Sequence, residues 1–159
     1  MRFPARVFIG LAWLSLAACA TPYKPYNRID GGFTETEVQP GLFLVRFVGN
    51  DATTPDRSTD FALPRAADIC LQRGKGFMRV GGLATQNVQS GYIAGATSST
   101  VIPSGSPDVP PVVSVSIMPP TLLYSPQSAL TVSCADSAQD GAWDANYLAR
   151  AIRTKYSMM

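Results

Sequence analysis

Two stretches in the first third of the chain carry the apolar pattern of β-strands. Residues 42–48 are apolar at every position except Arg46, and Pro-Gly and Gly-Asn pairs bound the run. A run that is apolar on both faces predicts a central strand covered by a helix on at least one side. Residues 33–39 alternate more weakly, with Phe33 and Val38 apolar, and they predict a first strand.

An apolar stripe at helical spacing follows a polar, turn-rich connection. Ser58 or Thr59 is suited to cap this helix, and Gly74 is typical of the position just past a helix end. Pro64 places the start of the regular helix near residue 64, or else a kink there, because proline removes a helical hydrogen bond. The stripe consists of Leu63, Ala66, Ala67, Cys70 and Leu71.

Further strands are predicted after the helix, around a stretch rich in proline, serine and glycine. Residues 77–83 predict a strand, and residues 86–127 then hold seven of the 13 prolines. We expect a flexible insertion over about 86–111, followed by a half-exposed main strand at 112–118 with alternating valine and serine. Residues 128–133 predict one more strand.

A final helix is predicted from Asp144 to Thr154. Acidic residues suit its start, and Arg150, Arg153 and Lys155 suit its end, where the helix dipole favours positive charge. Its apolar stripe is Tyr147, Leu148, Ala151 and Ile152. The elements together predict a single small two-layer α+β domain over residues 33–157. It would have three to five strands with two helices on one face, interrupted by the insertion.

The first 18 residues have the pattern of a targeting signal. Arg2 and Arg6 form a basic start, and the 12 residues from Val7 to Ala18 form an apolar core. A membrane-spanning helix needs about 20 residues, so this core predicts a signal peptide and not a permanent anchor.

The apolar core ends in Leu16-Ala17-Ala18-Cys19, which resembles the bacterial lipobox. That resemblance implies cleavage before Cys19 and attachment of lipid to its thiol and new amino group. Several acyl chains hold a protein stably at a membrane, whereas one chain does so only marginally. The alternative is an ordinary secretory signal that happens to be cut beside Cys19. Ala20, which stands where many inner-membrane lipoproteins have aspartate, favours the outer membrane.

Residues 19–32 are predicted to be the lipidated N-terminus and a flexible tether. Two prolines and the Gly31-Gly32 pair cannot sustain a helix in this stretch. A functional alternative has Tyr23 and Tyr26 resting on the membrane interface.

The composition and the charge balance of the chain exclude several classes of function. The chain of 159 residues has no histidine, which removes the Ser-His-Asp and Cys-His catalytic arrangements and every zinc site that uses histidine. The formal net charge of +2 belongs to Arg2 and Arg6, so the chain from Cys19 onward is neutral. No basic residue occurs between Arg79 and Arg150, and nucleic acid is therefore not an expected partner.

Cys70 and Cys134 are the two thiols that remain once Cys19 is lipidated. An even pair in an oxidising compartment favours a disulfide between the first helix and the last strand. Such a link would contribute about 2–4 kcal/mol. The alternative is a pair of buried, unbonded cysteines. A redox-active role is not expected, because no Cys-x-x-Cys motif or histidine lowers either pKa.

The remaining motifs have simpler structural explanations than catalysis or ligand binding. Asp136, Asp140 and Asp144 are spaced faintly like a calcium loop but lack the bidentate carboxylate, so capping and solvation explain them better. The glycines of residues 74–76 close a helix instead of opening one, which excludes a phosphate loop. Glu35 and Glu37 lack a third supporting group for glycoside chemistry. We therefore predict no catalytic, metal or cofactor site.

Two runs of the sequence resemble a family of uncharacterised Gram-negative lipoproteins. One run is Leu44–Asn50, with its Phe-x-Gly-Asn ending, and the other is Asp60–Asp68, with Arg-Ala-Ala-Asp. The Trp-Asp-Ala at residues 143–145 is similar to the family's final helix start. Pro64 and the proline-rich insertion depart from the family pattern. The resemblance implies the place and the fold but no chemistry.

These observations predict a non-enzymatic, membrane-anchored envelope lipoprotein. It would be held through lipidated Cys19 in the outer membrane, facing the periplasm, and would act as a structural or protein-interaction module toward another envelope protein or the cell wall. A carboxylate-based enzyme or a carrier of lipid or small ligands is the first alternative, and the carrier needs an apolar cavity beneath the helices. The second alternative is a disulfide-poised sensor of envelope stress, which needs exposed cysteines.

Overall fold

The computed structural model describes residues 20–102 and 112–158 of the chain. The predicted signal peptide, Cys19 and the centre of the predicted insertion lie outside these residues. The described part forms two compact units. We call the part up to Val88 together with the part from Ser125 the core unit, and Gln89–Tyr124 the hairpin unit.

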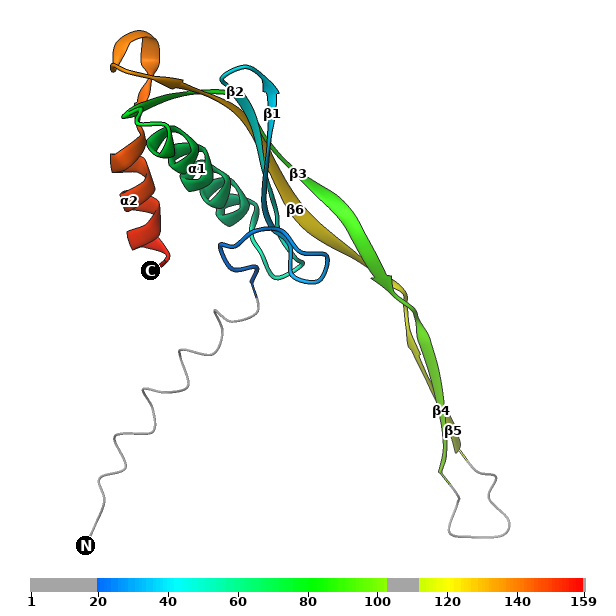
Figure 1. Cartoon of the computed structure of the whole chain (residues 1–159). Helices are drawn as coiled ribbons and strands as arrows, with labels where there is room; N and C mark the ends of the chain where they lie inside the picture. The colour runs from blue at the N-terminus through cyan, green and yellow to red at the C-terminus, as the bar shows by residue number, and fades with distance from the viewer. Residues whose placement is uncertain (1–19, 103–111, 159) are drawn as a thin grey trace, which may run out of the picture. The chain divides into compact units, whose positions relative to one another are not determined.

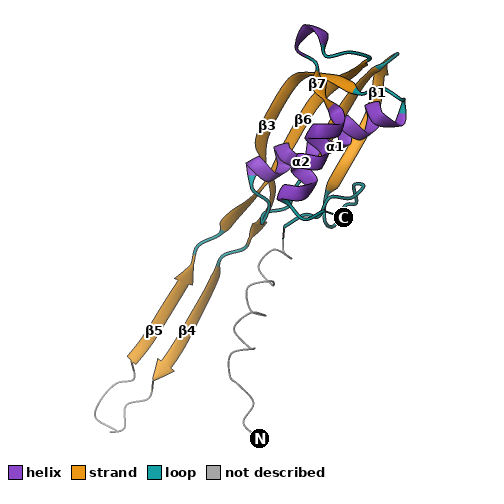
Figure 2. Cartoon of the chain, turned by 90° about the vertical axis from the view of Figure 1, so that its left-hand side faces the viewer, coloured by secondary structure: helices purple, strands orange, loops and turns teal. Residues whose placement is uncertain are grey.

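The core unit is built on a five-stranded antiparallel sheet in the order β1-β2-β6-β3-β7. Both helices lie on the same face of this sheet (Figures 1 and 2). The predicted α+β class, with two helices on one face, is confirmed. The elements are β1 (Gly32–Gln39), β2 (Leu42–Val48), α1 (Pro55–Gln72), β3 (Phe77–Ile93), β4 (Ala96–Ile102), β5 (Val112–Met118), β6 (Thr121–Ala135), a short 3-10 turn (Gln139–Gly141), β7 (Trp143–Asp144) and α2 (Ala145–Lys155).

Strand β2 supplies much of the core, as its apolar run predicted. Phe43, Val45 and Phe47 are buried on the side that α1 covers, whereas Leu42 and Leu44 on the other side are only partly buried. Val45 pairs with Leu130 of β6, which is also buried. Strand β6 lies between β2 and β3, so the chain must pass over β6 when it runs from β2 through α1 to β3.

Helix α1 begins earlier than its sequence pattern predicts. Thr54 is the N-cap, and its Oγ1 accepts a hydrogen bond from the Arg57 N–H at 3.2 Å. Pro55 follows in the first turn, where a missing N–H costs nothing. Ser58, an expected cap, is instead buried, and its hydroxyl accepts a hydrogen bond from Ser128 of β6 at 2.9 Å. The helix continues through Pro64.

Helix α2 starts where predicted but presents a different face. The Asp144 side chain accepts a hydrogen bond from the Tyr147 N–H at 2.8 Å and caps the helix. The buried positions are Ala145, Ala149 and Ile152, whereas the expected core residue Tyr147 is 69% exposed. Two small alanines on the buried face allow α2 to lie close to α1, and this packing decided the rotation of the helix.

The predicted flexible tether over residues 19–32 is wrong for the residues that the structure describes. Thr21 is fully buried, and two isolated β-bridges, Pro25 with Phe33 and Asn27 with Gly31, fold residues 20–33 into an ordered loop. Pro25 and Gly31, which suggested flexibility, each take part in one of these bridges.

The predicted flexible insertion is also wrong over its described part. Strand β3 extends to Ile93, and β4 follows directly, so residues 86–102 are largely extended. Strand β5 has the predicted bounds but does not join the main sheet. It pairs only with β4, in a separate two-stranded sheet. No proline occurs between Gly81 and Ile102, which leaves this part of the chain free to form strands.

A disulfide joins Cys70 of α1 to Cys134 of β6, as the sequence favoured. The two Cα atoms are 5.2 Å apart, and the cysteines are 64 residues apart in the chain. Cys70 is fully buried in the core. The bond therefore fixes the helix layer to the central strand of the sheet.

We expect the double variant Cys70→Ala, Cys134→Ala to unfold at lower urea concentration than the wild-type chain. The free energy of unfolding should fall by about 2–4 kcal/mol, because the unfolded chain regains the entropy that a long closed loop removes. Wild-type protein unfolded in reductant is the control and should show a similar loss. An unchanged unfolding midpoint in both samples would contradict a stabilising covalent link.

Candidate functional site

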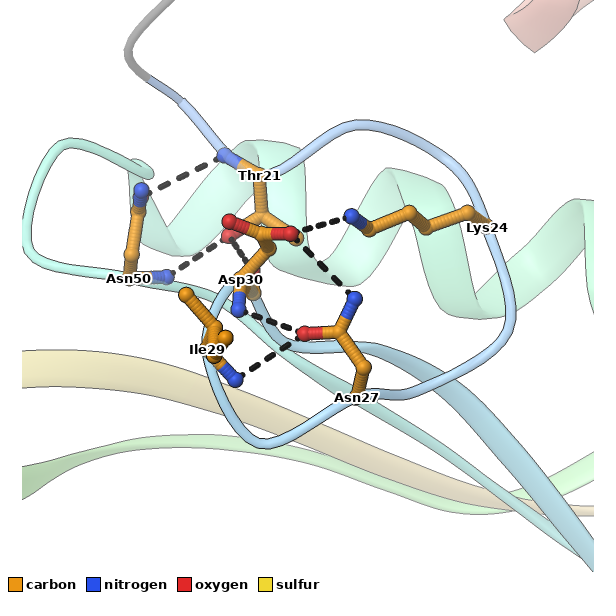
Figure 3. A network of polar contacts seen from close by, with 6 residues as sticks. All are labelled: Thr21, Lys24, Asn27, Ile29, Asp30 and Asn50. Atoms are coloured by element: carbon orange, nitrogen blue, oxygen red, sulfur yellow. Dashed lines mark hydrogen bonds and ion pairs between the residues drawn. The ribbon is translucent and has the colours of Figure 1, made fainter.

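The segment that follows Cys19 contains a network of polar contacts. We call residues 20–31 the N-terminal loop (Figure 3). The Asn27 side-chain oxygen accepts hydrogen bonds from the backbone N–H groups of Ile29, at 2.9 Å, and Asp30, at 2.7 Å. The Asp30 carboxylate in turn accepts from Lys24 at 2.5 Å and from the Asn27 amide at 3.2 Å. The loop is therefore held in one turn by its own side chains.

Thr21 joins the N-terminal loop to the connection between β2 and α1. Its backbone N–H donates to Asn50 Oδ1 at 3.3 Å and to Thr53 Oγ1 at 3.0 Å. Its hydroxyl donates to the Asp30 carbonyl at 2.7 Å and accepts from the Asn50 N–H at 2.9 Å. We call Thr21, Asp30, Asn50 and Thr53 the Thr21 network. Because Thr21 is fully buried, each of these polar groups would be costly to leave without a partner.

Two glycines allow the loop to lie against the end of β2. Gly31 and Gly32 both have positive φ, at 80° and 128°. A Cβ on Gly31 would stand 2.1 Å from the Val48 carbonyl oxygen, and one on Gly32 would stand 2.4 Å from the Lys24 carbonyl oxygen. The glycine pair is thus required by close backbone packing, not by flexibility.

Tyr23 fastens the same loop to both helices. Its ring packs against Phe33 and Phe61, with centroids 4.9 and 5.8 Å away. Its hydroxyl donates to the Asp68 carboxylate of α1 at 3.1 Å, and the same carboxylate accepts from Arg153 of α2 at 2.6 and 2.7 Å. Burial, followed by the charge of Asp68, raises the pKa of Tyr23 above its usual range.

Asp30 is the one carboxylate of the N-terminal loop, and its pKa is lowered. Hydrogen bonds from Lys24 and then from Asn27 hold the pKa of Asp30 below its usual value. The carboxylate remains about half exposed to solvent, so desolvation offsets only part of the stabilisation that these hydrogen bonds give its charge. The contribution is present above pH 4 and is lost as the pH falls through the lowered pKa.

The carboxylates singled out in the sequence serve the structure where their side chains are described. Glu35 pairs with Arg65, and Glu37 accepts the Gly41 N–H at 2.8 Å. Asp136 pairs with Lys75 at 2.7 Å. Within residues 20–102 and 112–158 there is no cluster of three ligand side chains that could hold a metal ion.

The residues at 74–76 form a helix end, as their order in the sequence indicated. Gly74 has a φ of 71° just after α1, and its N–H donates to the Leu71 carbonyl at 3.0 Å. Lys75 uses its charge in the pair with Asp136. These groups are engaged in ending the helix.

Two concave surfaces of the core unit bear on the carrier hypothesis. One, of about 500 Å³, lies at the end of α2 and is lined by residues between Arg150 and Met158. The other, of about 260 Å³, is lined by Arg46, Ala84, Gln86 and residues 127–129. Neither is the apolar cavity beneath the helices that a carrier needs. That space is filled by core side chains, which include Phe47, Phe61 and Leu130.

The sensor hypothesis meets a different difficulty. A disulfide exchanges only when a thiolate can reach one of its sulfur atoms; Cys70 is fully buried and Cys134 is partly buried, so access is restricted to the Cys134 side. The arrangement suits a structural disulfide better than a regulatory one.

The described part of the chain contains no helix that is both long and apolar enough to cross a bilayer. Comparison with protein-family models, with curated proteins and with solved structures finds no match for this chain.

The motif residues that suggested a lipoprotein family have a clear structural use. Gly49-Asn50 ends β2 and supplies the Asn50 side of the Thr21 network. Arg65 and Asp68 bind β1 and Tyr23, respectively. Sequence reasoning did not identify Thr21 as a buried residue or Tyr23 as a core residue. The Gly31-Gly32 pair was the available signal, because adjacent glycines can mark close backbone contact as well as flexibility.

We expect Thr21→Val to lower the free energy of unfolding by about 1–3 kcal/mol, because the part-buried Asp30 carbonyl loses its donor and the Asn50 N–H keeps only its longer bond to Thr53. Urea unfolding of the purified chain measures the effect. Thr36→Val, at an exposed position of β1, is the matched control and should change stability by no more than about 0.5 kcal/mol. Equal stability of the two variants would contradict the role of the Thr21 network.

Alkaline pH should destabilise the wild-type chain more than Tyr23→Phe. The unfolded chain ionises tyrosine near pH 10, whereas the folded chain keeps Tyr23 protonated to higher pH. Stability is therefore lost as the pH rises above 10. Burial also raises the pKa of Tyr156, so the variant removes only part of the slope. Tyr26→Phe is the control. Identical stability profiles between pH 9 and 11 for wild type and Tyr23→Phe would argue against this assignment.

Proposed function

We propose that this chain is a non-enzymatic envelope lipoprotein, acylated at Cys19 and held in the outer membrane facing the periplasm. The sequence carries the anchor in the lipobox at residues 16–19 and the outer-membrane preference in Ala20. The structural observation that supports the proposal best is the burial of Thr21, two residues after Cys19.

The Thr21 network makes the link between anchor and domain very short. Two residues of extended chain span at most about 7 Å. A lipid on Cys19 would therefore hold the adjoining end of the core unit against the membrane surface. The predicted tether would have let the domain move freely away from the bilayer, whereas this link fixes one end of it there.

The N-terminal loop has side chains suited to that position. Ile29 is 91% exposed, Tyr26 is 46% exposed, and Arg28 is exposed between them. An aliphatic residue, a tyrosine and a cation together are typical of a surface that meets the lipid headgroups. Tyr23, the other tyrosine considered for the interface, is used by the core.

The ion pairs of the core unit support a role as a structural or protein-interaction module. The carboxylates of Glu35, Asp60, Asp68 and Asp136 are all bound in ion pairs that hold elements together. Their partners come from other elements, so these charges serve the architecture. With one end fixed at the membrane, the remaining surface would meet another envelope protein or the cell wall.

Replacing Cys19 with serine tests the anchor. In cells given radiolabelled palmitate, the wild-type chain should be labelled and recovered with the outer membrane. Cys19→Ser should lose the label and move to the soluble envelope fraction, because it lacks the acyl chains that bind the bilayer. Ala20→Ser is the neighbouring control and should keep both properties. Unlabelled wild-type protein in the soluble fraction would overturn the proposal.

A further inference from the structure

The hairpin unit exposes apolar side chains that no other described residue covers. On β4, Val101 and Ile102 are 58% and 55% exposed. On β5, Val113, Val115 and Ile117 are 57%, 57% and 74% exposed. Exposed apolar residues that cluster in this way mark an interaction surface more often than scattered ones do.

The two strands divide these side chains unequally between the faces of the sheet. The register pairs Thr97 with Ile117, Ser99 with Val115 and Val101 with Val113. One face therefore combines three apolar side chains of β5 with two hydroxyl groups and one valine of β4. The opposite face carries serines at the middle of β5. Strand β5 is thus apolar on one face and polar at the centre of the other.

Both outer edges of the two-stranded sheet are unpaired among the described residues. Natural edge strands are protected by charges, prolines or bulges. Strands β4 and β5 contain no charged residue and no proline. Asp108 is the only charged residue between Arg79 and Asp136 in the sequence. A hairpin of two strands is also marginally stable by itself in water. These features indicate that another strand pairs with it.

The chemistry of the hairpin unit favours a second copy of this chain over lipid or a charged partner. Lipid alone would cover the valines but leave the backbone groups of both edges without hydrogen bonds. A charged partner would find no opposite charge on β4 or β5. A second copy of this chain offers an uncharged edge strand with the same two-residue alternation, and no like charges oppose its approach.

We propose that copies of this chain assemble through the hairpin unit, with the outer edge of β5 in one copy pairing with the outer edge of β4 in the next. Head-to-tail pairing satisfies both kinds of edge, whereas pairing β5 with β5 leaves every β4 edge exposed. The inference does not depend on acylation of Cys19, because the surface belongs to the hairpin unit alone.

Oligomeric state tests the proposal. The full chain carrying Cys19→Ser, so that no lipid promotes association, should sediment as an assembly of two or more copies. Adding Val115→Lys with Ile117→Lys should give monomers, because lysines on the edge strand β5 would have to be desolvated against the uncharged β4 of the next copy. Ile29→Lys, a matched change on the N-terminal loop, should leave the assembly intact. Circular dichroism and protection of both disulfide cysteines verify that the core unit is folded.

The results of this experiment test self-assembly independently of the proposed acylation of Cys19. A chain that is monomeric with serine at position 19 at all accessible concentrations would overturn the assembly, even if acylation is demonstrated. An assembly that survives the lysine pair would overturn the assigned surface.

Cysteine crosslinking tests the pairing of edges. Chains with Cys19→Ser and either Ser99→Cys or Val115→Cys would be coexpressed with different tags and then oxidised. Head-to-tail pairing predicts crosslinks between the two kinds of chain and none when either is expressed alone. Crosslinking of the Val115→Cys chain to itself would overturn the head-to-tail arrangement.

Discussion

The need to satisfy the buried polar groups of Thr21 is the constraint on which the rest of the core unit depends. A residue this close to the start of the described chain is usually exposed, yet Thr21 lies under the β2–α1 connection and exchanges hydrogen bonds with Asn50, Thr53 and Asp30. The network closes the end of the sheet, places Tyr23 against the helices and determines how far the domain stands from Cys19. Packing, helix attachment and proposed membrane position thus share one cause.

The helix layer is held by complementary kinds of interaction. Apolar side chains and the Cys70–Cys134 disulfide join α1 to the sheet, whereas α2 is bound through Arg153 to a carboxylate of α1 that also accepts from Tyr23. Isolated surface ion pairs contribute little, but a shared, partly buried carboxylate ties three segments at once. The aromatic contacts of Phe61 with Phe47 and Tyr156 fill the space between these links.

The two units treat strand edges in opposite ways. In the core unit, β1 has alternating polar positions and the Glu35–Arg65 pair, which suit a strand facing water. In the hairpin unit, β4 and β5 expose valine and isoleucine without any charge. One chain therefore contains a core with a polar edge strand and, in our proposal, a hairpin surface that a second copy completes. An anchored module built from copies of itself would use both properties.

The sequence alone determined the α+β class, the bounds of β2 and β5 and the start of α2, because these follow from local periodicity and turn residues. The count of thiols favoured the cysteine pairing, which the structure then showed. Only the tertiary structure decided that the Gly31-Gly32 segment is a packed loop and that α1 begins at Pro55. It also decided that β5 pairs with β4 outside the main sheet. Glycine and proline mark a change of direction in the chain, but the same residues suit a loose linker and a tight turn. Which of the two forms depends on whether a distant group, such as the side chain of Asn50, satisfies the backbone there.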